Sequence, residues 1–236
     1  MIEWPSANYE NFERIKRVHY DSAFLETILF FSGLEEEILQ RLQECSYLKE
    51  YNEGEILYYE KEKSDNLYFV IKGGLKFYKV DRFDNEIFLY QLKENSFVFD
   101  VAKFCEEGRF VCYANAEFTK KSLVINFESR SFREILNSSN ELMKRVLKEA
   151  LLTISELQCI INRDIVFDGT AKVAHMLATD LEEFNRLKKH EIAYKLHIQP
   201  ETLSRILRKL TRNGAILVEK NIVIVKDIEA LYEIFK

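Results

Sequence analysis

The spacing of apolar positions changes twice along this chain of 236 residues. Between Phe24 and Leu42 the apolar side chains recur at helical intervals, with a break at Ser32-Gly33. Residues 48–128 instead contain short aromatic and β-branched runs separated by Gly, Asn and Asp, which is typical of antiparallel strands. The strand-like runs lie at residues 55–59, 67–71, 75–80, 86–90 and 122–127. Helical spacing returns after Ser131, so the pattern predicts a compact antiparallel roll or barrel followed by helices.

One helix, from about residue 139 to 162, has apolar residues alternately four and three positions apart. They are Met143, Leu147, Ala150, Ile154, Leu157 and Ile161. This spacing is the seam of a coiled coil, whose apolar side chains need a partner along the whole helix. At 1.5 Å per residue the helix is ~36 Å long. We predict a homodimer through this seam, and packing of the seam on the chain's own β-domain is the alternative.

A second helical pattern follows, in which two short helices flank a tight turn at His197-Ile198. The second helix begins at Pro200, ends before Gly214 and separates into two faces. Its apolar face consists of Leu203, Ile206, Leu207 and Leu210, and its polar face of Glu201, Ser204, Arg205, Arg208 and Arg212. A hairpin at residues 215–218 and 222–225 comes next. This is the pattern of a winged helix-turn-helix, whose second helix enters a DNA major groove.

The charge of this region supports a nucleic-acid contact. Residues 185–214 hold eight Lys or Arg and two Glu, a net charge of +6, whereas the whole chain carries −5. One basic patch on an otherwise acidic chain is the expected footprint of a localised DNA contact. An ordinary solvated helix surface is the alternative reading of the charge alone.

We therefore expect an α+β fold in four parts. These are an N-terminal extension at 1–21, a cupin-like antiparallel β-roll resembling a cyclic-nucleotide-binding domain at 22–136, a dimerisation helix at 137–163 and a winged helix-turn-helix at 164–236. The sequence has neither a bilayer-spanning apolar run nor a secretory signal, which predicts a cytoplasmic protein without membrane contact.

Catalysis is disfavoured by the motifs. The sequence contains no glycine-rich phosphate loop, nucleophile elbow or paired histidines at metal-binding spacing. The cysteines, at 45, 105, 112 and 159, lack zinc-site spacing and are expected to be small buried apolar residues. A nucleotide-binding module that serves a separate partner protein is also disfavoured, because a complete winged domain follows the roll.

The order of roll, long helix and winged domain resembles the cyclic-AMP receptor protein and fumarate-nitrate reduction regulator (Crp/Fnr) family. Similar segments are Leu29-Phe30-Phe31-Ser32-Gly33-Leu34, Glu53-Gly54-Glu55-Ile56-Leu57 and residues 67–76. The most specific is Ile198-Gln199-Pro200-Glu201-Thr202-Leu203-Ser204-Arg205, the Glu-x-x-Ser-Arg form of the recognition helix. The resemblance implies regulation of transcription through double-stranded DNA with TTGAT-type half-sites, in contact with RNA polymerase.

The same resemblance assigns roles on the DNA. Glu201 accepts from a cytosine amino group, Arg205 donates to guanine O6 and N7, and Ser204 contacts a neighbouring base. Donor and acceptor geometry favours these pairings independently. Thr202 and the helix N-terminus would hold phosphate. Gln199 and Arg208 complete the expected surface, and Lys220 at the wing is expected to touch phosphate.

The sensor half departs from the cyclic-nucleotide members of the family. Those members bind the ribose with a Gly-Glu pair and the cyclic phosphate with an Arg-Ser pair. Alignment places Phe99-Asp100 and Phe110-Val111 there. A buried phosphate facing Phe and Val would lack its charge partner, so we do not expect cyclic AMP to bind. A one-residue shift that brings Arg109 into the site would reverse this expectation.

Residues 95–100 and 198–202 resemble the nitric-oxide-responsive branch, the dissimilatory nitrate respiration regulators. The resemblance implies a haem-borne response to nitrosative stress, in an apolar cavity between the roll and the long helix. The cavity candidates are Phe97, Phe99, Asp100, Phe110, Val111, Met143 and Leu147, and His19 is the candidate haem ligand. Ordinary core packing, a Cys105–Cys112 redox pair and an effector-independent regulator are the alternatives. An iron-sulfur cluster is disfavoured because residues 1–44 contain no cysteine.

Overall fold

The computed structural model describes residues 17–18, 20–62, 66–99, 112–220 and 222–235. The chain divides into two compact units, Met1–Thr153 and Ile154–Lys236. This division falls inside the long helix α5 (Asn140–Val166), so α5 contributes residues to both units. The sequence had instead suggested a boundary after the long helix.

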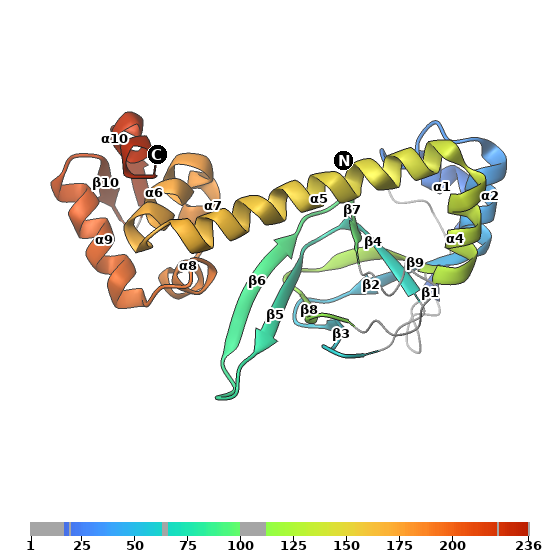
Figure 1. Cartoon of the computed structure of the whole chain (residues 1–236), viewed down its shortest axis with the longest axis horizontal. Helices are drawn as coiled ribbons and strands as arrows, with labels where there is room; N and C mark the ends of the chain where they lie inside the picture. Colours follow the sequence, from blue (N-terminus) through green and yellow to red (C-terminus); the bar gives the residue numbers. More distant parts are fainter. Residues whose placement is uncertain (1–16, 19, 63–65, 100–111, 221, 236) are drawn as a thin grey trace. The chain divides into compact units, whose positions relative to one another are not determined.

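The first unit is built from short helices and two antiparallel sheets (Figure 1). Its helices are α1 (Ser22–Glu26), α2 (Glu36–Glu44) and α4 (Ser129–Ser138). The five-stranded sheet has the order β1-β2-β9-β4-β7, with bounds Arg17–Val18, Ser46–Tyr51, Ser122–Glu128, Asn66–Lys72 and Ser96–Val98. The four-stranded sheet has the order β3-β8-β5-β6, with bounds Ile56–Tyr58, Asn115–Phe118, Leu75–Val80 and Glu86–Leu92.

Two apolar clusters lie on opposite sides of the five-stranded sheet. Successive side chains of a strand point to opposite faces, and β9 shows this clearly. Leu123, Ile125 and Phe127 belong to the cluster beneath the helices, whereas Val124 belongs to the cluster inside the roll. Phe97 also lies in the first cluster. Both faces of β9 are therefore buried, which explains its nearly continuous apolar sequence.

The first turns of α5 are fixed to this unit. Leu142 and Val146 are buried in the cluster beneath the helices. Arg145 Nη1 donates to the carbonyl oxygens of Phe30 at 2.9 Å and Ser32 at 2.6 Å. The α1–α2 loop and α5 are thus joined by both packing and charge-assisted hydrogen bonds.

The second unit adds five helices and a hairpin to the end of α5. They are α6 (Gly169–Thr179), α7 (Leu181–Arg186), α8 (Lys189–Lys195), α9 (Pro200–Arg212), β10 (Ile216–Glu219), β11 (Ile222–Val225) and α10 (Ile228–Phe235). One apolar cluster joins α6 to α10 with the hairpin. The His175 ring contacts Phe167 in a tilted arrangement and Phe235 edge to face, with centroids 5.6 and 5.1 Å apart. The winged helix-turn-helix expected from the sequence is therefore present.

The observed elements confirm the predicted α+β architecture and refine its boundaries. All five predicted strands are present, and the structure adds β1, β2, β7 and β8. Between α5 and α8 the chain forms two helices, α6 and α7, that are separated at Asp180. The side chain of Asp180 accepts a hydrogen bond from the backbone N–H of Glu183 at 3.3 Å, which starts α7 as a new helix.

Candidate DNA interface

Helix α9 forms because one side of it is buried and both of its ends are well defined. Leu203, Ile206, Leu207 and Leu210 are all buried in the core of the second unit. Pro200 occupies the first turn, where its missing N–H costs nothing. At the other end Gly214 has φ +79°, and Ala215 N–H donates to Leu210 at 3.1 Å. This Schellman arrangement ends the helix where the sequence predicted.

The opposite side of α9 carries the residues predicted to read DNA. Glu201, Arg205 and Arg208 are exposed, and Thr202 and Ser204 are half-buried. The exposed Gln199 side chain makes no capping hydrogen bond in the described structure, so first-turn N–H groups stay open to an acceptor. A helix N-terminus of this kind favours phosphate. One helix thus presents base-reading groups together with a phosphate-binding end.

The turn before α9 is also a Schellman arrangement. His197 has φ +54°, and its N–H donates to the carbonyl of Tyr194 at 3.2 Å. The N–H of Ile198 donates to the carbonyl of Ala193 at 3.0 Å. A non-glycine residue in the left-handed region is uncommon. The sharp reversal places α8 against α9, as a helix-turn-helix requires.

A groove of about 880 Å³ runs beside α9. Its walls come from α7, the start of α8, the last turns of α9 and the hairpin. The cationic lining residues are Lys188, Lys189, Arg208 and Arg212, and Ser204 and Thr211 add hydroxyl groups. The lining contains no acidic side chain among the residues that the structure describes there. The groove therefore has the size and charge to take part of a polyanion.

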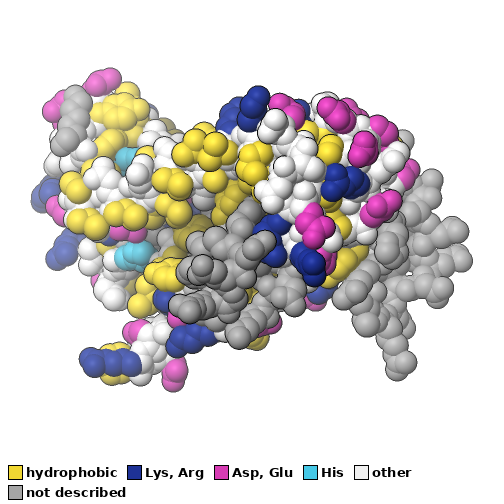
Figure 2. All heavy atoms as spheres, turned by 45° about the vertical axis from the view of Figure 1, so that its right-hand side comes forward, with side chains coloured by type: hydrophobic (Ala, Val, Ile, Leu, Met, Phe, Trp, Pro, Cys, Tyr) yellow, Lys and Arg dark blue, Asp and Glu magenta, His cyan; other side chains and the backbone are white. Residues whose placement is uncertain are grey.

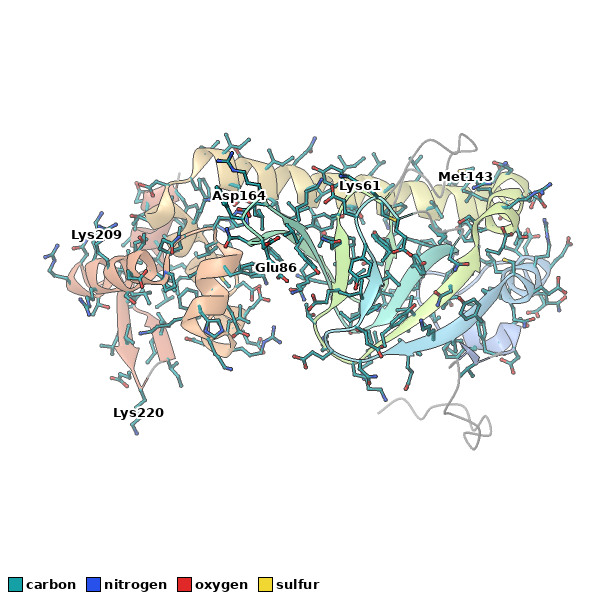
Figure 3. The ribbon with its side chains drawn as sticks, turned by 90° about the horizontal axis from the view of Figure 1, so that it is seen from below. Lys61, Glu86, Met143, Asp164, Lys209 and Lys220 are labelled. Atoms are coloured by element: carbon teal, nitrogen blue, oxygen red, sulfur yellow. The ribbon has the colours of Figure 1, made fainter. Side chains whose placement is uncertain are left out.

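The hairpin is held in place by a residue that the sequence did not single out. Asn185 in α7 accepts from Val223 N–H at 2.8 Å and donates to the Val223 carbonyl at 2.9 Å. These two bonds fix β11 beside α7. Lys220 lies at the tip of the hairpin and extends away from the unit (Figure 3). A side-chain amide pairing with a distant backbone has no sequence signature, so Asn185 could not have been found by spacing.

The predicted sensor residues are only partly brought together. Phe97 is fully buried, with its ring 4.8 Å from Phe69 and 5.7 Å from Phe132 by centroids, and Phe99 packs beside it at 5.9 Å. Met143 and Leu147, by contrast, are 38% and 57% exposed on α5. Asp100, Phe110, Val111 and His19 lie outside the described residues, as does Cys105.

Among the described residues, the first unit contains no histidine that could bind a haem iron. Phe97 is surrounded by other rings, and the three described histidines, His175, His190 and His197, all belong to the second unit. Within the described part of the chain, His, Cys, Asp and Glu side chains form no cluster able to hold a metal ion.

Two domain families match this chain. The cyclic nucleotide-binding domain matches residues 48–139, and the Crp-like helix-turn-helix domain matches residues 171–234. Together with the geometry of α8, α9 and the hairpin, these matches define a DNA-binding transcription regulator with an effector-type N-terminal domain. The chain belongs to the Crp/Fnr family of such regulators. Among the curated proteins none matches this chain.

Solved structures support the same fold. A Crp/Fnr-family structure from Eubacterium rectale has a TM-score of 0.66 at 16% identity, covering 87% of this chain and 97% of that one. A CooA variant from Carboxydothermus hydrogenoformans gives 0.64 at 18%, covering 87% and 94%. CLP of Xanthomonas campestris, described as responsive to cyclic di-GMP, gives 0.62 at 17%, covering 81% and 99%. At these identities the likeness concerns the fold alone.

Among the described residues no helix is both long and apolar enough to cross a membrane.

Proposed function

We propose that this protein is a homodimeric, sequence-specific regulator that binds palindromes with TTGAT-type half-sites. The observation that carries the proposal is the coincidence of two features on α9. Its exposed side carries Glu201 and Arg205, and its last turns border the basic groove. Base-edge contacts specify sequence, whereas phosphate contacts position the protein, and α9 offers both.

Each group has a role in this proposal. Arg205 donates to guanine, Glu201 accepts from cytosine and Ser204 contacts a neighbouring base. Gln199, Thr202 and the first turn of α9 hold phosphate on one strand. The groove cations and the exposed Lys220 hold the phosphates on the flanks of the site. The groove adds Lys188, Lys189 and Arg212 to the phosphate contacts that the resemblance implied.

The dimer in this proposal forms through α5. Large apolar side chains are exposed on the surface drawn in Figure 2, and several belong to this helix. Met143, Leu147, Ile154 and Ile161 of the predicted seam are exposed, and Ala150 and Leu157 are half-buried. Leu142 and Val146 on another side of the helix are buried against the roll. Packing on the chain's own roll therefore leaves the seam open for a second copy.

The roll is the effector domain in this proposal, and it does not answer to cyclic AMP. The haem-borne nitric-oxide cue is a separate proposal that rests on the sequence resemblance of residues 95–100 and 198–202. An absorption spectrum after haem reconstitution tests it, since a haem protein shows a Soret band that shifts with nitric oxide. Contact with RNA polymerase is likewise proposed from the family, and co-sedimentation on operator DNA is its test.

Fluorescence anisotropy with labelled duplexes tests the DNA-binding function. At physiological salt the protein should bind the TTGAT palindrome at least about a thousandfold more tightly than a scrambled duplex. Equal affinity for both duplexes would overturn sequence-specific recognition.

A further inference from the structure

Asp164, on the last turn of α5, links three segments of the second unit (Figure 3). Its Oδ1 lies 3.6 Å from Nζ of Lys172 in α6. Its Oδ2 lies 3.6 Å from Nδ1 of His197, in the turn between α8 and α9. One carboxylate thus lies between the long helix, the helix after it and the turn that starts the recognition helix.

The contact with Lys172 fixes the carboxylate. The Lys172 side chain is only 10% exposed, and that of Asp164 is 20% exposed. A buried ammonium group is costly unless an opposite charge accompanies it, and Asp164 supplies that charge. The Asp164 carboxylate is therefore held in place by its pairing with the buried Lys172 as well as by its contact with His197.

Side chains also pack closely where α5 meets α6. A Cβ added at Gly169, the first residue of α6, would lie 3.5 Å from side-chain atoms of both Ile198 and Ile206. The start of α6 therefore adjoins both the turn and the recognition helix. This observation is independent of the charges, and it shows that the corner between α5 and α6 lies directly against the helix-turn-helix.

We propose that Asp164 is a positioning residue, which fixes the orientation of α9 relative to the last turns of α5. The inference rests on the proposed function, because its consequence appears only on DNA. In a dimer paired along α5, the orientation of each α9 sets the distance and angle between the two recognition helices. That geometry sets the separation of the two half-sites that the dimer can bind. Asp164 therefore contributes to discrimination between spacings, without itself touching DNA.

The test measures anisotropy with three duplexes: the TTGAT palindrome, the same palindrome with one base pair inserted between its half-sites, and a scrambled duplex. Asp164→Asn should bind the palindrome about five- to tenfold more weakly. It should also lose most of the wild-type preference for the palindrome over the inserted duplex. Asp164→Glu should restore part of that preference. Glu156→Gln is the matched control, because it removes an exposed carboxylate from the same helix, and it should behave as wild type.

Loss of charge beside Lys172 could instead unfold the second unit, and two further variants separate this outcome. Asp164→Asn combined with Lys172→Met removes both buried charges but still lacks the contact with His197. His197→Asn keeps a residue that tolerates positive φ and removes the imidazole. Both variants should be folded, as shown by a cooperative unfolding transition in urea. Both should lose the preference for the palindrome over the inserted duplex.

The outcomes are distinguishable. Wild-type protein that fails to prefer the palindrome over the scrambled duplex overturns the proposed function and this inference with it. Wild-type preference that persists unchanged in Asp164→Asn and His197→Asn overturns the inference alone.

Discussion

Arg205 shows how far single residues of the DNA interface follow from sequence. The helical spacing of Leu203, Ile206, Leu207 and Leu210 required a buried side, so Arg205 had to be exposed, and it is. Asn185 and Asp164 could not be inferred, because each acts through contacts between segments that are distant in sequence. Periodicity predicts which side of a helix faces solvent, but it does not predict which distant polar groups meet.

Arg205→Ala should weaken binding to the palindrome by about 1 to 3 kcal/mol per half-site, because a bidentate contact with guanine is lost. Preference at that base pair should relax as well. Lys220→Ala is the comparison, since the loss of a phosphate contact should weaken binding to all sequences alike. Anisotropy titrations on duplexes substituted one base pair at a time measure both effects. Unchanged discrimination in Arg205→Ala would show that another side of α9 faces the bases.

The cysteines give a prediction about pH. Burial, with the neighbouring Glu128 carboxylate, raises the pKa of the Cys45 thiol from an ordinary 9.0 to about 12. An unfolded chain ionises this thiol near pH 9, but the folded protein keeps it protonated, so its contribution to stability should fall as pH rises from about 9 to 12. Cys159 is exposed, so the burial expected for all four cysteines is wrong for this one, and at pH 8 iodoacetamide should modify it much faster than Cys45, as read by peptide mass spectrometry. Equal rates would contradict the burial of Cys45.

Among the elements, α5 is buried on one side against the roll and exposes apolar side chains of the predicted seam on another. Ile154→Lys would place a charge in the proposed seam, where it would lie near its symmetry mate and lose hydration. We expect a folded monomer that no longer binds the palindrome tightly. Ser155→Lys adds the same charge at an exposed position on the side of the helix away from the seam and should remain dimeric. Analytical ultracentrifugation at micromolar concentration measures both. A monomeric wild type would remove the proposed dimer.

The turn between β4 and β5 is tightly packed at Gly73. Gly73 has φ +120°, and an added Cβ would lie 2.0 Å from Oγ of Ser122. Gly73→Ala should therefore destabilise the first unit by more than ~2 kcal/mol, through strain and overlap together. Gly54 also has positive φ but has nothing within 4 Å of an added Cβ, so Gly54→Ala should cost only about 1 kcal/mol. Urea denaturation compares the two variants, and equal losses would contradict the role of Ser122.

For the whole molecule, the order of domains was readable because each has its own apolar period. Short aromatic and β-branched runs predicted five strands of the roll, and the heptad-like seam predicted α5. β1, β2, β7 and β8 were missed because none of them carries a long apolar run: β1, β7 and β8 have two to four residues, and Lys49 and Glu50 interrupt β2. The candidate effector residues come from both the roll and α5, and spacing along the chain does not specify which of them meet in the fold.

In the proposed function, the winged domain reads DNA sequence through α9. The most direct measurement is the affinity of the wild-type protein for the TTGAT palindrome and for a scrambled duplex of equal length, titrated by anisotropy over a range of salt concentrations. We predict tight binding to the palindrome, with a preference that persists at physiological salt, and weak binding to the scrambled duplex that falls steeply with salt. Equal affinities with the same salt dependence would mean that only phosphates are bound, and would contradict sequence reading through α9.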